Sequence, residues 1–269
     1  MVERILITGA AGGVGTFLRT GLAESGWSVR AFDLVLPEDL GDAEWLLGDV
    51  NDPAALGTAM VGVDAVIHLA GIPVEDSFAK VLTANIAGTY EVFEAAVRAG
   101  VRRVVYASSN HAVGYYRRGD FPASDIAVDV RPRPDTYYGV SKVFGEALGS
   151  FYADRHGMSV ACVRIGSCFA VPRTVRMLDT WLSPADAVRL FHALLTAPDL
   201  GYEIVYGVSA NTRGWWDLES ARRLGYEPRD DAEVFAETVE AACGPLDADD
   251  PEAVYLGGRF TTAVPSLDG

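Results

Sequence analysis

The sequence predicts an α/β protein built on a doubly wound parallel sheet, with a small cap contributed by its C-terminal third. Short apolar runs with the character of buried strands alternate with longer amphipathic segments as far as about residue 165. A glycine-rich turn follows the first apolar run, and an aspartate ends the second. Such alternation implies right-handed crossovers between parallel strands, with helices on both faces of the sheet.

The first strand is expected at Arg4–Thr8, and the helix that follows it should end near Ser25. Between them lies a glycine loop whose residues are Gly9, Ala10, Ala11, Gly12, Gly13, Val14 and Gly15. Glycines allow the tight turn and the close approach of a pyrophosphate, and the helix N-terminus offers N–H groups to the phosphates. The order of strand, glycine loop and helix predicts the entry of a Rossmann-like dinucleotide-binding domain.

The second strand, Ser28–Phe32, ends in Asp33. An acidic residue about 20 positions after the glycine loop is typical of the side chain that binds the adenosine ribose. Its carboxylate can accept hydrogen bonds from both ribose hydroxyls of NAD, and it would repel the 2′-phosphate of NADP. Because Arg30 lies within the strand and is poorly placed to reverse this, the sequence favours NAD as the cofactor.

Further strands are expected at 44–47, 65–69, 103–107 and 160–164, with helices over about 78–99 and 138–155. A helix near 185–196 and a strand near 203–207 should return to the sheet, followed by helices near 217–224 and 231–242. The segment 112–137 is rich in Pro, Gly and charge, which indicates a long loop. We therefore expect an NAD-binding domain over 1–165 and a mainly substrate-binding cap over 166–269, with 185–207 returning to the sheet.

Tyr138 and Lys142 stand four residues apart in a predicted helix, so they share one face of it. A free tyrosine hydroxyl has a pKa of about 10, and a neighbouring ammonium lowers that pKa by stabilising the phenolate. The pair therefore suits a general base that removes a proton from an alcohol. Ser109 follows the strand 103–107 at the carboxyl edge of the sheet, where ligands bind, and it can hydrogen-bond a substrate oxygen.

The bulk properties narrow the class of protein. A chain of 269 residues that is 49% hydrophobic and 22% charged suits one large globular α/β domain with a sizeable core. No apolar run reaches the roughly 18 residues needed to span a membrane, and no secretory signal is visible, so a cytoplasmic location is expected. Three cysteines without a C-x-x-C pair argue against a disulfide framework and against a metal site. A formal net charge of −15 argues against nucleic acid and anionic membranes as partners.

These motifs together resemble the extended branch of the short-chain dehydrogenase/reductase superfamily, and the resemblance covers nearly the whole chain. It is carried by the segments 8–15, 49–50, 68–71, 108–109 and 138–142 and by Asn85. Within the superfamily the chain is most similar to the bacterial uronate dehydrogenases. That closer similarity is carried by the segments 107–111, 164–168, 176–181, 209–211 and 214–217, which are far more specific than the glycine loop.

The resemblance implies a set of NAD contacts along the carboxyl edge of the sheet. The implied cofactor-binding residues are Gly9, Gly12, Gly13, Val14, Gly15, Asp33, Asp49, Val50, Leu69, Ala70, Gly71, Asn85, Ser108, Tyr138, Lys142 and Ile165. His68 lies in an apolar strand, and we expect it to be a hydrogen-bonded histidine of the core rather than a ligand.

The same resemblance implies NAD-dependent oxidation of D-galacturonate or D-glucuronate at the anomeric carbon, giving the aldarolactone. The implied catalytic residues are Ser109, Tyr138 and Lys142, and the implied substrate-binding residues are Ser109, Asn110, His111, Tyr138, Ser167 and Arg176. Arg176 is the candidate for selectivity, because a guanidinium can pair with a carboxylate through two hydrogen bonds. A homo-oligomer is also expected.

The sequence departs from the family pattern at Pro73, where a serine is expected. Proline offers neither a hydroxyl nor an N–H, so one substrate contact is missing or is replaced by Ser77. Two other functions remain open: a sugar or nucleotide-sugar epimerase or dehydratase of the same superfamily, and a non-catalytic NAD-sensing protein. The small cap and Arg176 count against the first, and the intact Ser109, Tyr138 and Lys142 count against the second.

Overall fold

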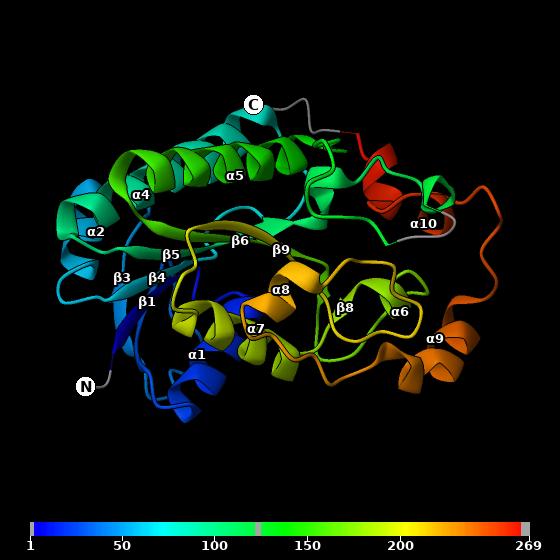
Figure 1. The fold of residues 1–269 in the computed structure, drawn as a ribbon, viewed down its shortest axis with the longest axis horizontal. Coiled ribbons are helices and arrows are strands. Elements are labelled where there is room, and N and C mark those ends of the chain that lie inside the picture. The colour runs from blue at the N-terminus through cyan, green and yellow to red at the C-terminus, as the bar shows by residue number, and fades with distance from the viewer. Residues whose placement is uncertain (1–2, 122–124, 265–269) are drawn as a thin grey trace.

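Seven parallel strands form the central sheet in the order β3-β2-β1-β4-β5-β6-β9 (Figure 1). The structure is a computed structural model that describes residues 3–121 and 125–264. The strands of the sheet are β1 (Arg4–Thr8), β2 (Ser28–Asp33), β3 (Glu44–Leu47), β4 (Ala65–His68), β5 (Arg103–Ser109), β6 (Ser159–Ile165) and β9 (Tyr202–Gly207). The prediction of a Rossmann-like, doubly wound parallel sheet is confirmed.

The strand order reverses at β1, which pairs in parallel with β2 on one side and β4 on the other. Ile5 marks the register, because it lies opposite both Val29 and Ala65. The chain leaves β1 towards β2 and β3 and then returns past β1 to form β4, β5 and β6. A reversal of this kind opens a crevice beyond the carboxyl ends of the strands, and ligands of open parallel sheets bind there.

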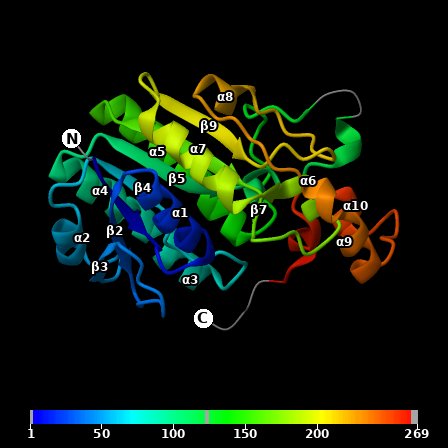
Figure 2. The same cartoon turned by 90° about the horizontal axis from the view of Figure 1, so that it is seen from below.

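Helices cover both faces of the sheet (Figures 1 and 2). α1 (Gly13–Glu24) and α7 (Pro184–Thr196) pack together on one face, while α2 (Pro53–Ala59), α4 (Gly88–Ala99) and α5 (Tyr137–His156) cover the other. Ile5 and Ile7 contribute to the core under the first pair, whereas Leu6 belongs to the core under the second group. Successive residues of a strand point to opposite faces, so one short apolar strand serves two hydrophobic layers.

Most of the elements that follow β6 are short. β7 (Ser167–Cys168) pairs with β8 (Trp181–Leu182), and α6 (Met177–Thr180) connects them. The later helices are α8 (Glu219–Arg223), α9 (Ala236–Cys243) and α10 (Pro251–Val254). Between these elements, β9 pairs with β6 at the edge of the sheet and α7 packs against α1. Across the described ranges, no helix has both the length and the apolar character needed to cross a bilayer.

The expected elements match the structure closely in the first two thirds of the chain, with three differences. Helix α2 was not predicted, although Asp52 caps it by accepting hydrogen bonds from the N–H groups of Ala54 and Ala55. The expected helix over 78–99 is divided into α3 (Phe78–Val81), a π-helical segment (Leu82–Ala87) and α4. The predicted loop 112–137 contains the 3₁₀ turn Arg118–Asp120, and part of it lies outside the described residues.

Candidate active site

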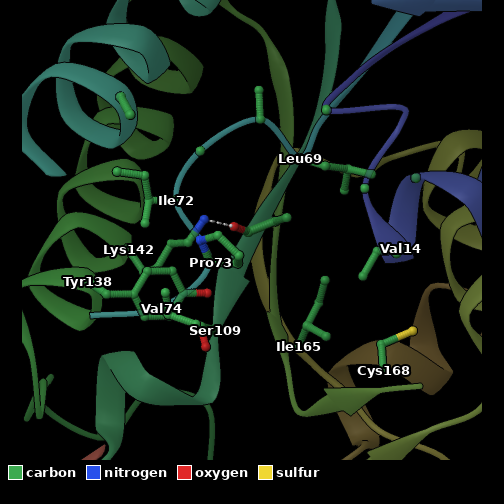
Figure 3. Close-up of a pocket in the computed structure, with 18 of the residues that line it drawn as sticks. Val14, Leu69, Ile72, Pro73, Val74, Ser109, Tyr138, Lys142, Ile165 and Cys168 are labelled. Atoms are coloured by element: carbon green, nitrogen blue, oxygen red, sulfur yellow. Dashed lines mark hydrogen bonds between the residues drawn. The ribbon is translucent and has the colours of Figure 1, made fainter. Parts of the chain in front are cut away.

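A cavity of about 1200 Å³ lies at the carboxyl ends of β1, β2, β4, β5 and β6. It exceeds the roughly 300–1000 Å³ of pockets that hold drug-sized ligands, which suits a dinucleotide together with a small sugar. Figure 3 shows Tyr138, Lys142 and Ser109 on one side of this space, facing Val14, Ile165 and Cys168 on the other. The carboxyl edge of the sheet therefore brings the predicted base and the glycine loop into one cavity.

The glycine loop fits a bound pyrophosphate at the N-terminus of α1. Gly9 has φ +72°, and a Cβ there would lie 2.6 Å from the backbone nitrogen of Ala70. A Cβ on Gly15 would lie 2.4 Å from the carbonyl oxygen of Gly9, whereas one on Gly13 would meet nothing within 4 Å. Gly9 and Gly15 thus allow the turn to pack against the helix and the residues after β4, while Gly13, the first residue of α1, lines the cavity.

Asp33 lies at the rim of the cavity at the end of β2. Its Oδ2 accepts a hydrogen bond from the N–H of Ala11 at 2.9 Å, and its Oδ1 accepts one from the N–H of Leu34 at 2.7 Å. The carboxylate therefore ties the glycine loop to β2 at the place expected for the adenosine ribose. Leu34 and Val35, which follow it along the cavity, are apolar and offer no cation for a 2′-phosphate.

Most of the residues expected to bind NAD line this cavity. The lining includes Gly9, Gly12, Gly13, Val14, Gly15, Asp33, Asp49, Val50, Leu69, Ala70, Gly71, Ser108, Tyr138, Lys142 and Ile165. Asn85 does not line it. The Asn85 side chain donates to the carbonyl of Ile72 at 3.0 Å and accepts from the Ile72 N–H at 2.8 Å, so it holds the 71–72 turn from behind.

Tyr138 and Lys142 lie in the first turns of α5, whose N-terminus is capped by Thr136. The Lys142 Nζ donates a hydrogen bond to the carbonyl of Ala107 at 2.7 Å (Figure 3) and lies 5.4 Å from the centre of the Tyr138 ring. Glu75 accepts hydrogen bonds from the backbone N–H groups of Tyr137 and Tyr138, at 3.2 and 3.0 Å. The helix that carries the base is thus fixed both to β5 and to the 71–77 loop.

The expectation that Lys142 lowers the pKa of Tyr138 is wrong for this structure. Burial raises the pKa of the Tyr138 hydroxyl to about 12, and a side-chain interaction with Ser109 offsets only part of that rise. Burial also lowers the pKa of Lys142 to about 8. Removing both groups from water disfavours the phenolate and the ammonium, and Lys142 is not among the groups that lower the pKa of Tyr138.

Ser109 ends β5 and caps the 3₁₀ turn that follows it. Its Oγ accepts a hydrogen bond from the His111 N–H at 3.2 Å and donates one to the Asn110 Oδ1 at 3.2 Å. Ser109 and His111 line the cavity, but Asn110 does not. The Asn110 Nδ2 points instead to the carbonyl of Leu256, at 3.4 Å, so the structure places Asn110 behind the cavity wall.

Arg176 lines the cavity from the segment that precedes α6. Its Nε and Nη2 both donate to the carbonyl oxygen of Leu256, at 2.8 and 2.6 Å. Burial lowers the pKa of the guanidinium, and nearby Asp179 raises it in part. Because the Nε edge is occupied, the fork that remains for a carboxylate is the end formed by Nη1 and the second hydrogen of Nη2.

Two further substrate predictions have different outcomes. Ser167 lines the cavity, and its Oγ lies 2.9 Å from the Oγ1 of Thr180. Pro73 also lines the cavity and supplies no hydroxyl there. Ser77, suggested as its replacement, is buried, does not line the cavity, and has an Oγ without a hydrogen-bond partner among the described residues. The contact that a serine would make at position 73 is therefore not restored by Ser77.

Sequence reasoning missed several residues that line the substrate end of the cavity. Phe260, from the C-terminal segment, stacks on His111 with ring centres 4.0 Å apart. Phe169 and Met177 line the same end. Phe260 lies in a tail without hydrophobic periodicity, so only its long-range contacts reveal its place. No group of three or more His, Cys, Asp or Glu side chains within the described ranges is arranged to hold a metal.

Comparison with known proteins identifies the family to which this chain belongs. Residues 5–177 match the sequence profile of the NAD dependent epimerase/dehydratase family, and the chain belongs to that family. A uronate dehydrogenase of Pseudomonas putida is 44% identical over 98% of this chain and 97% of its own length. The crystal structure of a mutant uronate dehydrogenase from Agrobacterium tumefaciens, complexed with NAD, has a TM-score of 0.91 and 41% identity, and the match covers 97% of this chain and 98% of that one.

Within this family the chain therefore belongs to the uronate dehydrogenases. A relative of different specificity is also present. The NAD-dependent glucose-6-phosphate dehydrogenase of Haloferax volcanii is 40% identical over 87% of this chain and 96% of its own length. The choice of sugar must therefore be argued from the cavity itself.

Proposed function

We propose that this protein oxidises a hexuronate, D-galacturonate or D-glucuronate, at its anomeric carbon with NAD, and that the product is the aldarolactone. The observation that carries this proposal is a single cavity lined by the glycine loop, by Tyr138 with Ser109, and by Arg176. The cavity thus offers a dinucleotide site, a base beside the reacting carbon, and a cation for the sugar carboxylate.

Each step has a group of this chain to perform it. The Tyr138 oxygen takes the proton of the anomeric hydroxyl, and the Ser109 hydroxyl holds the same oxygen as it becomes a carbonyl. NAD, when bound, supplies the acceptor for the hydride that leaves the anomeric carbon. Lys142, Ile165 and Asp33 line the cavity; the first two would hold the nicotinamide end of NAD, and Asp33 would hold its adenosine ribose.

The high pKa of Tyr138 shapes how this base works. With a pKa of about 12, the hydroxyl is protonated at neutral pH, and only a small fraction is phenolate. Turnover should therefore increase with pH above neutrality, as that fraction grows. Positive charge brought near Tyr138 would lower its pKa, because it stabilises the phenolate.

A sugar phosphate is the second candidate substrate, favoured by the Haloferax relative. A phosphate monoester carries a charge of about −1.5 to −2 at neutral pH, so a second cationic partner would favour its binding. Besides Arg176 the cavity is lined by Lys80 and Lys142; the Lys80 Nζ is paired with Asp76 at 3.1 Å, and the Lys142 Nζ is held by the Ala107 carbonyl. One available guanidinium edge matches a carboxylate better than a phosphate. Epimerisation of a nucleotide sugar would also require room for a second nucleotide in the same cavity.

We also place the enzyme in the cytoplasm as a homo-oligomer. Cys162, Cys168 and Cys243 are all free thiols, which suits a reducing compartment. Light scattering on the purified protein would establish the oligomeric state, and a monomer at micromolar concentration would contradict this part of the proposal.

The direct test is the appearance of NADH absorbance when NAD is mixed with galacturonate or glucuronate. Parallel reactions contain glucose 6-phosphate, arabinose, galactose and UDP-glucose. We expect turnover with one or both uronates to exceed that with every other sugar by at least about tenfold, with the lactone as the first product. Absence of NADH with either uronate, or faster turnover of the sugar phosphate, would overturn the proposal.

A further inference from the structure

His111 lines the cavity, and a buried carboxylate that does not line it holds the ring from behind. The Asp135 Oδ2 lies 2.7 Å from the His111 Nδ1, and the Asp135 side chain is 0% exposed. The Oδ1 of Asp135 accepts a hydrogen bond from the Thr136 Oγ1 at 2.9 Å. Both carboxylate oxygens are therefore occupied, one of them by the imidazole.

The chain makes room for this carboxylate with glycines from two distant segments. A Cβ on Gly114 would lie 1.9 Å from the Asp135 Oδ2, and one on Gly257 would lie 1.8 Å from the same atom. Gly257 also donates a backbone hydrogen bond to the carbonyl of Gly114 at 2.9 Å. A side chain at position 114 or 257 would occupy the space of the Asp135 carboxylate, so the two glycines make room for it.

The ring of His111 is fixed on its other sides as well. Phe260 stacks on one face with ring centres 4.0 Å apart and planes at 27°, and Tyr138 meets the ring at 5.8 Å and 64°. Together with the contact between Nδ1 and Asp135, these ring contacts hold the imidazole in a single orientation. Nε2 has no hydrogen-bond partner within the described residues, and it is not among the buried atoms that lack one, so it opens into the cavity.

Chemistry then determines which nitrogen carries the proton. A carboxylate only accepts hydrogen bonds, so the nitrogen that faces Asp135 must be the protonated one. Burial lowers the pKa of His111; Asp135 raises it in part, and the charge of Arg176 lowers it further. The ring is therefore neutral at neutral pH, and its Nε2 presents a lone pair to the cavity.

We propose that Asp135 is a positioning residue: it holds His111 in the tautomer protonated on Nδ1, so that Nε2 accepts a hydrogen bond from a hydroxyl group of the sugar. The identity of the sugar rests on the proposed function. The two polar side chains have separate tasks, because Arg176 only donates and the neutral His111 can only accept at Nε2. A carboxylate has no proton to give, so His111 favours a hydroxyl and Arg176 favours the carboxylate.

The first test reads the tautomer in the ligand-free protein. Long-range proton–nitrogen correlation spectra distinguish the two neutral tautomers of histidine, and this chain contains only four histidines. The His111 signal is assigned by its loss in His111→Gln. We expect the Nδ1-protonated form at neutral pH. An Nε2-protonated ring, or an imidazolium, in the unmodified protein would overturn the proposal without any variant having to fold.

The second test removes only the charge of Asp135. In Asp135→Asn, Thr136 can still donate to the side-chain oxygen, which turns the amide nitrogen towards His111 and favours the opposite tautomer. We expect kcat/KM for the uronate to fall about tenfold, mainly through KM, while the KM for NAD changes less than twofold. Asp186→Asn is the matched control, since the Asp186 side chain is also 0% exposed and lies outside the cavity. It accepts hydrogen bonds from the backbone N–H groups of Arg229 and Asp230 and pairs with Arg189. The control should leave both the His111 signal and the kinetics unchanged.

A double-mutant comparison separates positioning from a general structural role. If Asp135 acts through His111, then Asp135→Asn introduced into His111→Phe should change kcat/KM less than twofold further. An equal tenfold loss in both backgrounds would show that Asp135 acts independently of the imidazole. The spectra use no substrate, so failure of the proposed uronate activity would leave the tautomer result standing, and the reverse also holds.

Discussion

The two ends of the cavity are held together in different ways. The cofactor end is built from backbone at the edge of one sheet, where β1, β2 and β4 finish side by side. The end proposed for the substrate is lined by side chains from the separate segments 109–111 and 167–177 and, through Phe260, from the C-terminal segment. Those segments are joined by contacts such as the hydrogen bonds from Arg176 to the carbonyl of Leu256 and the stacking of Phe260 on His111.

The difference indicates how each end responds to change. The sheet fixes most of the frame at the cofactor end, and Asp33 is the side chain there that also ties the glycine loop to β2. At the end proposed for the substrate, Arg176 both offers a cation to the sugar and holds the segment that contains Leu256. We therefore expect variants to separate NAD binding from sugar binding.

The largest effect should come from Tyr138→Phe, which lies where the two ends meet. Loss of the hydroxyl removes the base but keeps the ring and its packing, so kcat should fall at least about a hundredfold. The NAD dissociation constant, measured by quenching of protein fluorescence, should change less than twofold. Turnover close to that of the unmodified enzyme would contradict the role given to Tyr138.

Arg176→Ala should have the next largest effect, and it should be confined to the substrate end. Hydrogen bonds to charged groups contribute roughly 1.5–3 kcal/mol each, so a lost carboxylate pair should lower kcat/KM for uronates about a hundredfold. Neutral sugars, if they react, should be little affected.

Arg176→Lys is the matched variant, and we expect it to recover only part of the loss, because an ammonium keeps the charge without the planar fork. Equal losses with uronates and neutral sugars would mean that Arg176 serves the structure alone, through Leu256. A loss of NAD affinity in the same variants would break the separation between the two ends.

Asp33→Ala tests the cofactor end and should have a smaller effect. The unmodified enzyme should prefer NAD to NADP, and removal of the carboxylate should narrow that preference about tenfold by ending its repulsion of the 2′-phosphate. The KM for the uronate should stay within about twofold. A preference of the unmodified enzyme for NADP would show that Asp33 does not face the ribose.

Some features of the fold and the site could be predicted from the sequence, and others could not. The strands, the glycine loop and the Tyr138–Lys142 pair were predicted because each is a local pattern with a fixed spacing. The direction of the Tyr138 pKa was predicted wrongly, since the burial that raises it comes from the surroundings as a whole. Phe260 and the carbonyl of Leu256 could not be predicted, because their partners lie far away in the chain and their own segment carries no periodicity.

The smallest effect on activity is expected at His68, which was predicted to belong to the core. That prediction is confirmed: His68 is buried, its Nδ1 lies 2.7 Å from the Thr8 Oγ1 and its Nε2 lies 3.0 Å from the Thr89 Oγ1. Burial lowers its pKa from 6.5 to about 3, with the charge of Lys142 contributing. Between pH 6.5 and 3, His68 is therefore protonated in the unfolded chain but mostly neutral in the folded state.

The sign of the resulting pH effect follows from linkage. The folded-state pKa lies below the unfolded one, so the contribution of His68 to stability is complete above pH 6.5 and is lost as the pH falls towards 3. Between pH 7.5 and 5.0 the free energy of unfolding should fall by about 2 kcal/mol from this group. Urea unfolding of His68→Gln should show a shallower pH dependence by that amount, with both KM values nearly unchanged. Identical pH dependences in the two proteins would contradict this account.

The carbonyl of Leu256 has a consequence for how mutations at the substrate end would be tolerated. Every amino acid supplies a backbone carbonyl, so replacing the side chain at position 256 leaves the acceptor for Arg176 in place. Deleting a single residue nearby would shift the backbone by up to 3.8 Å, about the distance between neighbouring Cα atoms, and the acceptor would be lost. A requirement for leucine at position 256 would therefore reflect the packing of its side chain and not the hydrogen bonds to Arg176. The orientation of Arg176 depends instead on the length of the C-terminal segment, so insertions and deletions there should be poorly tolerated.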